Sequence, residues 1–238
     1  MVNYIKWTFL DRFCIGKFDI HEHLQEFSTF ISQKGAPLDC IVGFMDGTAR
    51  AISRPSQFQQ AFYSGYYKMH CLKFQSIAFP NGMIYLNGPF VGCKNDLFML
   101  RESRIREELY EKGKLNLNGK DHYIYCDSGY VDNEFILTGF SKQQLINDKG
   151  REEFNRKMSS CREVVEWGFG KIITLFAFLD FNKNLKLLSQ PVADYYFVGL
   201  FLSNCHTCIY GSQINNYFNS DPPTLEEVFG SIARVESR

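Results

Sequence analysis

An almost unbroken apolar run at residues 40–45 predicts a β-strand that is buried on both faces. The run ends at a carboxylate, Asp46, which is followed at once by Gly47 and Thr48. A charged side chain at the end of a buried strand loses hydration unless a partner compensates for it, and a divalent metal ion is one such partner. A turn cap is the alternative interpretation of Asp46, because Asp-Gly is a common turn pair.

Two further apolar segments predict a β-hairpin beside this strand. Residues 66–79 and 83–86 carry the apolar positions of two strands, and the Pro-Asn-Gly sequence at 80–82 between them is typical of a tight turn. A fourth strand is expected at 122–126, again followed by a carboxylate, and a short fifth strand at 134–137. Because helical segments alternate with these strands, we expect an α/β fold.

Helical periodicity predicts the elements that cover the sheet. One helix is expected at 97–110, with Asn95 or Asp96 as its N-cap residue. Residues 159–179 predict one long helix, amphipathic at first and then strongly apolar, and residues 194–210 predict another buried helix.

Composition excludes several classes of protein. Hydrophobic residues make up 45% of the 238 positions and aromatic residues 16%, so disorder does not describe most of the chain. The 26 basic and 26 acidic residues balance, so any DNA contact requires local clusters of charge. Eight scattered cysteines do not form a secreted disulfide pattern, and no apolar run approaches the ~20 residues of a membrane helix, so we expect an intracellular protein without a membrane partner.

Three carboxylates stand where the predicted elements could bring them together. Asp46 and Asp127 each follow a strand, and Glu166 lies on the long helix, which could return over the sheet. Converging carboxylates repel one another unless cations neutralise them, so this set predicts a divalent metal site. Two Mg²⁺ ions about 4 Å apart could activate water or a 3′-hydroxyl for attack on a phosphodiester.

Arg162 lies four residues before Glu166, so both side chains would share one face of a helix. Arg162 could orient the carboxylate or hold a phosphate group. An ordinary ion pair on the helix is the alternative, and spacing alone favours that alternative.

Several motifs resemble the DDE-type transposases of the PIF/Harbinger group, and they occur in the family's order over roughly residues 38–210. They are Phe44-Met45-Asp46-Gly47-Thr48, Arg54-Pro55 with Gln59, Tyr63-Ser64-Gly65-Tyr66 with His70, Gly88-Pro89 to Asp96, Tyr125-Cys126-Asp127-Ser128-Gly129-Tyr130, and Phe154-Asn155 through Ser160, Arg162, Val165-Glu166 and Phe169-Gly170. The resemblance implies an RNase H-like fold, in which a mixed five-stranded sheet is flanked by helices. It also implies cleavage and joining of DNA strands with Mg²⁺ or Mn²⁺.

Carried over by position, the resemblance makes Asp46, Asp127 and Glu166 the catalytic, metal-binding triad. Asp96 is an alternative ligand or a residue just outside the ligand set, because the family usually carries an acidic residue here, often after histidine. This chain has Asn95 before it, which departs from that pattern. Asp127 is preferred because it ends a strand that can lie beside the first one. Candidate contacts to DNA phosphates are Arg50, Arg54, Lys68 and Lys73.

The expected organisation is a helical N-terminal extension at 1–37, a catalytic domain at 38–210 and a C-terminal tail at 211–238. Such transposases usually have a helical DNA-binding region ahead of the catalytic domain, so the chain is expected either to be a fragment or to rely on a partner. The resemblance implies transposon ends as the DNA, a Myb-like DNA-binding partner protein and the nucleus as the compartment. Assembly into a homo-oligomer stays open.

Three functions follow as alternatives from these residues. The main hypothesis is a transposase-derived endonuclease that cuts and joins DNA with an Asp/Asp/Glu triad. A generic RNase H-like nuclease would cut nucleic acid and join nothing. A domesticated DNA- or protein-binding domain would keep the fold and the carboxylates without turnover. The presence of all three acidic positions favours an enzyme.

Overall fold

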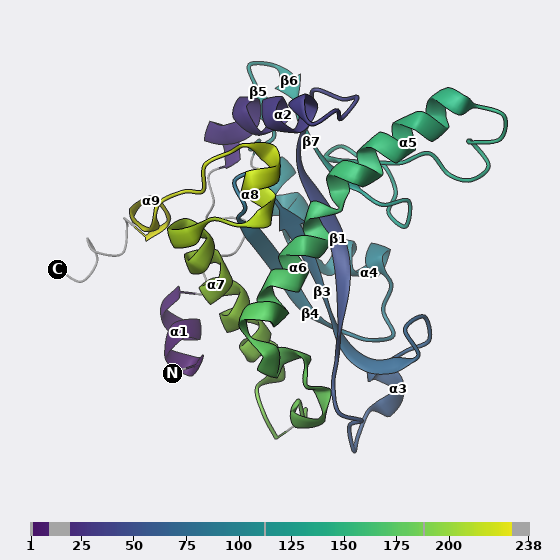
Figure 1. The fold of residues 1–238 in the computed structure, drawn as a ribbon. Coiled ribbons are helices and arrows are strands. Elements are labelled where there is room, and N and C mark those ends of the chain that lie inside the picture. The colour runs from purple at the N-terminus through teal and green to yellow at the C-terminus, as the bar shows by residue number, and fades with distance from the viewer. Residues whose placement is uncertain (1, 10–19, 112, 188, 230–238) are drawn as a thin grey trace.

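The structure is a computed structural model that describes residues 2–9, 20–111, 113–187 and 189–229, and Figure 1 shows their arrangement. A mixed sheet lies at its centre. In spatial order its main strands are β4 (Ile84–Val91), β3 (Met69–Ala78), β1 (Ile41–Ala51), β7 (Tyr123–Cys126) and β8 (Ile136–Thr138). The two-residue strand β2 (Tyr63–Ser64) pairs with the N-terminal end of β3. The predicted α/β fold with five main strands is confirmed.

The sheet contains both antiparallel and parallel pairs of strands. β1 pairs antiparallel with β3, and β3 pairs antiparallel with β4, whereas β7 runs parallel to β1 and β8 parallel to β7. The predicted turn closes the β3–β4 hairpin, where Gly82 has a φ of 82° and its N–H donates to the Phe79 carbonyl at 3.0 Å. A positive φ of this size favours glycine, which explains why the turn forms here.

Strand β1 continues past Asp46, so the prediction that Asp46 ends the strand is wrong. Residues 47–51 stay paired with β3, since Gly47 lies opposite Gln75 and Ala51 opposite Cys71. The parallel partner β7 is shorter and stops at Cys126. Asp46 therefore lies within β1 but beside the open end of β7.

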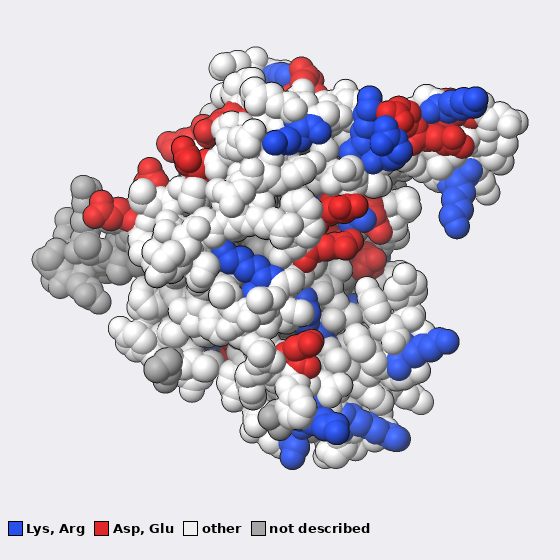
Figure 2. All heavy atoms as spheres, viewed as in Figure 1, with Lys and Arg blue, Asp and Glu red and all other residues white. Residues whose placement is uncertain are grey.

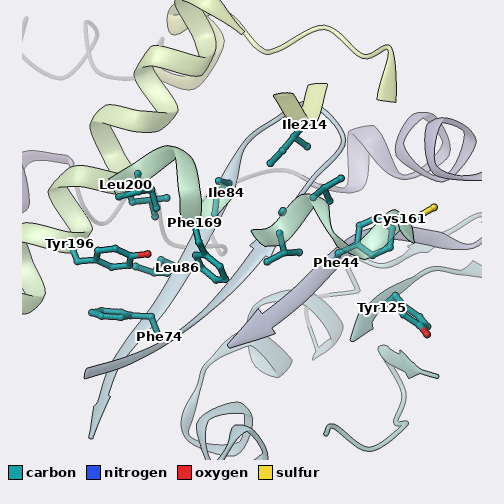
Figure 3. Packing of buried hydrophobic residues seen from close by; sticks show 14 of the residues in the cluster. Phe44, Phe74, Ile84, Leu86, Tyr125, Cys161, Phe169, Tyr196, Leu200 and Ile214 are labelled. Carbon is teal, nitrogen blue, oxygen red and sulfur yellow. The ribbon is translucent and has the colours of Figure 1, made fainter. Parts of the chain in front are cut away.

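Two apolar cores cover the two faces of the sheet. On one face Phe44 of β1, Phe74 of β3, Tyr125 of β7 and Phe169 of helix α6 (Val164–Leu175) belong to one buried cluster, and Figure 3 shows these residues spread along the sheet. Met45 points to the opposite core. Because Phe44 and Met45 are both fully buried, β1 is covered on both sides, as its apolar run predicts.

The prediction of one long helix at 159–179 is wrong, because the structure divides this segment into separate helices. Helix α5 (Lys149–Arg162) ends at the junction residue Glu163, α6 follows, and a 3₁₀ turn η5 (Ala177–Asp180) comes after it. α5 is mostly polar and extends away from the sheet, whereas the apolar α6 packs against β1 and β3 (Figure 1). Only the apolar part gains from burial, so the helix leaves the sheet where the sequence becomes charged.

The helix expected at 97–110 is also shorter in the structure. Helix α4 (Asp96–Glu102) begins with Asn95 as its N-cap, whose Oδ1 accepts a hydrogen bond from the Phe98 N–H at 2.9 Å. A π-helical segment, η4 (Arg106–Glu111), follows. Asn95 therefore satisfies the helix start, and the Asp96 carboxylate is left for other interactions.

The remaining elements complete the layers. They are α1 (Val2–Phe9), η3 (Ile20–His23), α2 (Leu24–Gln33), α3 (Gln59–Phe62), β5 (Asn116–Leu117), β6 (Lys120–Asp121), η6 (Asn182–Asn184), α7 (Val192–Tyr210), α8 (Gln213–Phe218) and α9 (Leu225–Phe229). Helix α7 forms where the sequence predicts it. Across the described ranges, every helix is too short or too polar to span a membrane.

Both terminal segments contribute to the same cores. In the expected N-terminal extension, Phe27 of α2 stacks on Phe79 with ring centroids 5.6 Å apart. In the expected tail, Phe218 of α8 stacks on Phe44 at 6.2 Å. The cores thus extend beyond 38–210, while residues 1, 10–19 and 230–238 lie outside the described part of the chain.

The close packing of the backbone around Gly92, between β4 and α4, can be tested by substitution. A Cβ atom added there would lie 2.2 Å from the Phe62 carbonyl oxygen and 2.9 Å from that of Cys71, and neither backbone atom can move alone. We predict that Gly92→Ala lowers the free energy of unfolding by ~1–3 kcal/mol or more in urea denaturation. The control Gly170→Ala, with nothing within 4 Å of its added Cβ in α6, should raise it by ~0.5–1 kcal/mol. Equal effects would contradict the packing described for Gly92.

Candidate active site

Asp46 forms an ion pair that joins the sheet to the helices. Its Oδ1 accepts the Gly47 N–H at 2.8 Å, and its Oδ2 accepts a hydrogen bond from Nη1 of Arg162, the last residue of α5. The two side chains are only 20% and 19% exposed. Burial raises the pKa of Asp46, the Arg162 charge and the Gly47 N–H oppose this rise, and the Asp127 carboxylate adds to it.

Asp127 follows β7 at a position that corresponds to Asp46 on β1. Phe44 lies opposite Tyr125, and each aspartate comes two residues after its member of this pair, Asp46 within β1 and Asp127 just past the end of β7. The Asp127 Oδ1 accepts the Gly129 N–H at 2.9 Å, which fixes the carboxylate at the start of its loop. Since its charge acts on Asp46, the structure brings together the two aspartates that the sequence pairs.

Asp96 approaches the same region from the opposite face of the sheet. Its Oδ1 lies 2.9 Å from the place of an added Cβ on Gly47, and successive residues of a strand point to opposite faces. Burial raises the pKa of Asp96, the Lys73 charge opposes this rise, and the Asp127 charge adds to it. The Asp127 charge therefore raises the pKa of both Asp46 and Asp96, which approach β1 from opposite faces.

Sequence reasoning missed a buried polar pair beside these carboxylates. Nε2 of Gln75, on β3, donates to the hydroxyl of Tyr130 at 2.9 Å, and Gln75 is fully buried. Burial strongly raises the pKa of Tyr130, so its hydroxyl stays neutral. Within the described structure, Gln75 Oε1 and Ser76 Oγ have no hydrogen-bond partner. The signal in the sequence was the Gln-Ser pair between the apolar residues Phe74 and Ile77 of this strand.

Glu166 lies elsewhere in the structure. It is exposed on α6 and lines a hollow of about 530 Å³ together with Lys171 and His206. The Arg162 guanidinium forms its ion pair with Asp46 on the sheet. In the described ranges, no three Asp, Glu, His or Cys side chains lie close enough together to hold a metal ion. The ligand role of Glu166 stays a prediction from the resemblance.

The candidate DNA-binding cations divide into two pairs. The Arg50 Nε donates to the Tyr196 hydroxyl at 3.0 Å, and the Lys73 Nζ donates at 2.6 Å to the backbone carbonyl two residues ahead of α4. These two side chains are engaged within the fold. Arg54 and Lys68 are exposed on the surface, where the Arg54 guanidinium also donates to Gln59 Oε1 at 3.0 and 2.8 Å.

Comparison with known proteins decides the family. The family model of the DDE superfamily endonucleases matches residues 45–204, well over half of the chain, and the match includes all four acidic candidates. The chain belongs to this family. No curated protein and no solved structure matches it. The DDE-type part of the resemblance is thus confirmed, and DNA is the substrate that membership of the family implies.

The donor chemistry of this DDE endonuclease fits a hard divalent cation. Figure 2 shows acidic side chains beside basic ones where α5 meets α6. Asp46 and Asp127 offer carboxylate oxygens, the ligands that Mg²⁺ and Mn²⁺ prefer. Their mutual repulsion contributes to the raised pKa of Asp46, and a bound cation would remove that repulsion. Asp46 and Asp127 are therefore the residues that would hold the ion.

The raised pKa of Asp96 predicts a pH-dependent stability. The folded protein holds the proton of the Asp96 carboxyl group more tightly than the unfolded chain does. The contribution of Asp96 to stability therefore falls as the pH rises from 3.8, the ordinary pKa of aspartate, towards the raised pKa of Asp96 in the folded protein. Without divalent ions, Asp96→Asn should therefore melt at a higher temperature than the parent at pH 7, and the difference should shrink as pH falls towards 4. The exposed Glu152→Gln should change stability by less than ~0.5 kcal/mol. A lower melting temperature for Asp96→Asn at pH 7 would contradict this account.

Removing the Arg162–Asp46 ion pair should lower stability, and a bound cation should restore part of that stability. Arg162→Gln leaves a partly buried carboxylate without its positive partner and should cost ~1–3 kcal/mol in metal-free buffer. Millimolar Mn²⁺ should raise the melting temperature of this variant more than that of the parent. Arg156→Gln, which removes only an exposed pair with Glu153, should cost less than ~1 kcal/mol. Similar losses in both variants would refute the role given to Arg162.

Proposed function

We propose that this DDE endonuclease cuts and joins DNA with an RNase H-like catalytic domain of the PIF/Harbinger type. One observation carries the proposal: Asp46 on β1 and Asp127, the residue directly after the parallel strand β7, each come two residues after the paired Phe44 and Tyr125, within the segment that matches the endonuclease family. The strand order and directions are compatible with an RNase H-like fold. The sequence motifs support the PIF/Harbinger type.

Each residue of the site has a distinct role in this proposal. Asp46 and Asp127 hold the ions, and Glu166 completes the triad, as the resemblance implies. Arg162 orients Asp46 and neutralises its charge. Asp96 stays just outside the ligand set, because it reaches the strand from the Gly47 side. Bound Mg²⁺ or Mn²⁺ supplies Lewis acidity and charge neutralisation for attack on the phosphodiester by water or a 3′-hydroxyl.

The proposal includes the substrate and partners implied by the resemblance. Formal charge is balanced over the chain, and two of the four candidate cations are engaged inside the fold. Recognition of transposon ends would therefore depend on other contacts, for which a Myb-like DNA-binding partner in the nucleus is the proposed source. Self-association into a homo-oligomer is a second source of such contacts.

One observation favours a second candidate, a domesticated binding domain. Arg162 already neutralises Asp46, and the described side chains contain no cluster of three potential metal ligands. A chain of this kind could keep its fold and bind DNA or protein without catalysis. Such a domain would bind DNA equally well with and without Mn²⁺ and cut nothing.

A cleavage assay on DNA with terminal repeats separates these functions. We predict Mn²⁺-dependent cutting that falls ~10²-fold or more in Asp46→Asn and Asp127→Asn, because charge neutralisation at the phosphate is lost. Glu166→Gln should show the same loss, whereas Glu163→Gln, at the exposed residue between α5 and α6, should stay active.

The outcomes distinguish the alternatives. Loss of activity in Glu163→Gln but not in Glu166→Gln would move the third carboxylate to Glu163. Cutting without strand joining would identify a generic RNase H-like nuclease. Absence of cutting in the parent, with DNA binding intact, would support the binding domain.

A further inference from the structure

Four aromatic side chains are exposed around the β2–β3 hairpin. Tyr66 is 86% exposed, Phe58 68%, Tyr67 43% and Tyr63 42%, and we call these four residues the aromatic edge. Large apolar side chains grouped on a surface commonly mark a place where a partner binds. The catalytic roles proposed above do not use them.

The aromatic edge is held by hydrogen-bonded backbone. Tyr63 lies opposite His70 in the β2–β3 pairing, and their rings make an edge contact at 5.4 Å. The Tyr67 N–H donates to Ser64 Oγ at 3.4 Å, and the rings of Tyr66 and Tyr67 meet at 4.8 Å. Rings that are already ordered lose little freedom when they bind a flat ligand.

A chain of contacts links the aromatic edge to the carboxylates. Nζ of Lys73 lies 5.7 Å from the centre of the Tyr67 ring and donates to the Lys94 carbonyl at 2.6 Å. Asp96 comes two residues later, and its Oδ1 lies beside Gly47, next to Asp46. These contacts reach β1 on its Asp96 side. Burial raises the pKa of Tyr67, and the charges of Asp96 and Asp46 add to the rise, so the aromatic edge lies near the carboxylates of both faces.

The surrounding charges indicate the chemistry of the partner. Lys68 lies in the same turn and Arg54 comes shortly before Phe58, and both are exposed. Exposed aromatic rings next to cations match single-stranded nucleic acid, because bases stack on the rings and phosphates meet the cations. The bases of an intact duplex are already stacked on both sides, so only unpaired bases could use these rings.

We propose that the aromatic edge stacks unpaired bases of the DNA strand beside the carboxylate site. This inference rests on the proposed function, since it names the form in which DNA reaches that site. It predicts a preference for single strands or forked ends over blunt duplex. Tyr66, the most exposed of the four rings, supplies the largest stacking surface.

DNA binding without divalent ions tests the proposal apart from catalysis. In EDTA, fluorescence anisotropy would measure the affinity of the parent for a single-stranded oligonucleotide, a forked duplex and a blunt duplex. We expect Tyr66→Ala to weaken single-strand binding ~5- to 150-fold and Tyr66→Phe to retain it. Tyr210→Ala, at a tyrosine 75% exposed at the end of α7, is the matched control and should bind like the parent.

Two results would overturn the stacking proposal: equal single-strand affinity of Tyr66→Ala and Tyr210→Ala, or a parent that prefers blunt duplex. Phe58→Ala provides a second variant, and thermal melting confirms that each variant folds. A parent that binds as expected but never cuts in Mn²⁺ would refute the nuclease function and leave the stacking surface intact. A parent that cuts, with Tyr66→Ala binding unchanged, would refute the stacking surface alone.

Discussion

The ion pair between Arg162 and Asp46 connects the helical layer to the central strand. It lies where the polar α5 gives way to the apolar α6, and its carboxylate sits on β1, which pairs with both halves of the sheet. Burial disfavours the charged form of Asp46, and Arg162 opposes that effect. The course of the helices and the charge on the strand therefore depend on each other.

The electrostatics of the site follow from the alternation of side chains along β1. Asp46 has Arg162 on one face of the sheet, and Asp96 has Lys73 on the other, while Asp127 acts on both aspartates from the end of β7. Three carboxylates thus face two cations. The excess negative charge is what a divalent cation would neutralise, and it lies within the segment shared with the DDE endonucleases.

The sequence predicted the features that local pattern controls. The apolar run of β1, the Pro80-Asn81-Gly82 turn and the pairing of Asp46 with Asp127 follow from periodicity and strand adjacency. The extension of β1 to Ala51 depends on pairing with β3, and the break at Glu163 depends on where the sheet stops offering apolar surface. The Arg162–Asp46 contact joins residues 116 positions apart, so no local rule could predict it. The family match includes Glu166 but does not position its side chain, so its role as a ligand of the divalent ions stays a prediction.

The most direct measurement is X-ray diffraction from crystals soaked in Mn²⁺, with data collected at the manganese absorption edge. The account predicts anomalous density between the carboxylates of Asp46 and Asp127, with the Arg162 guanidinium displaced from at least one oxygen of Asp46. Density there that also contacts Glu166 would complete the triad. Manganese bound only elsewhere, or none beside Asp46 at saturating concentration while Arg162 keeps its place, would contradict the central claim.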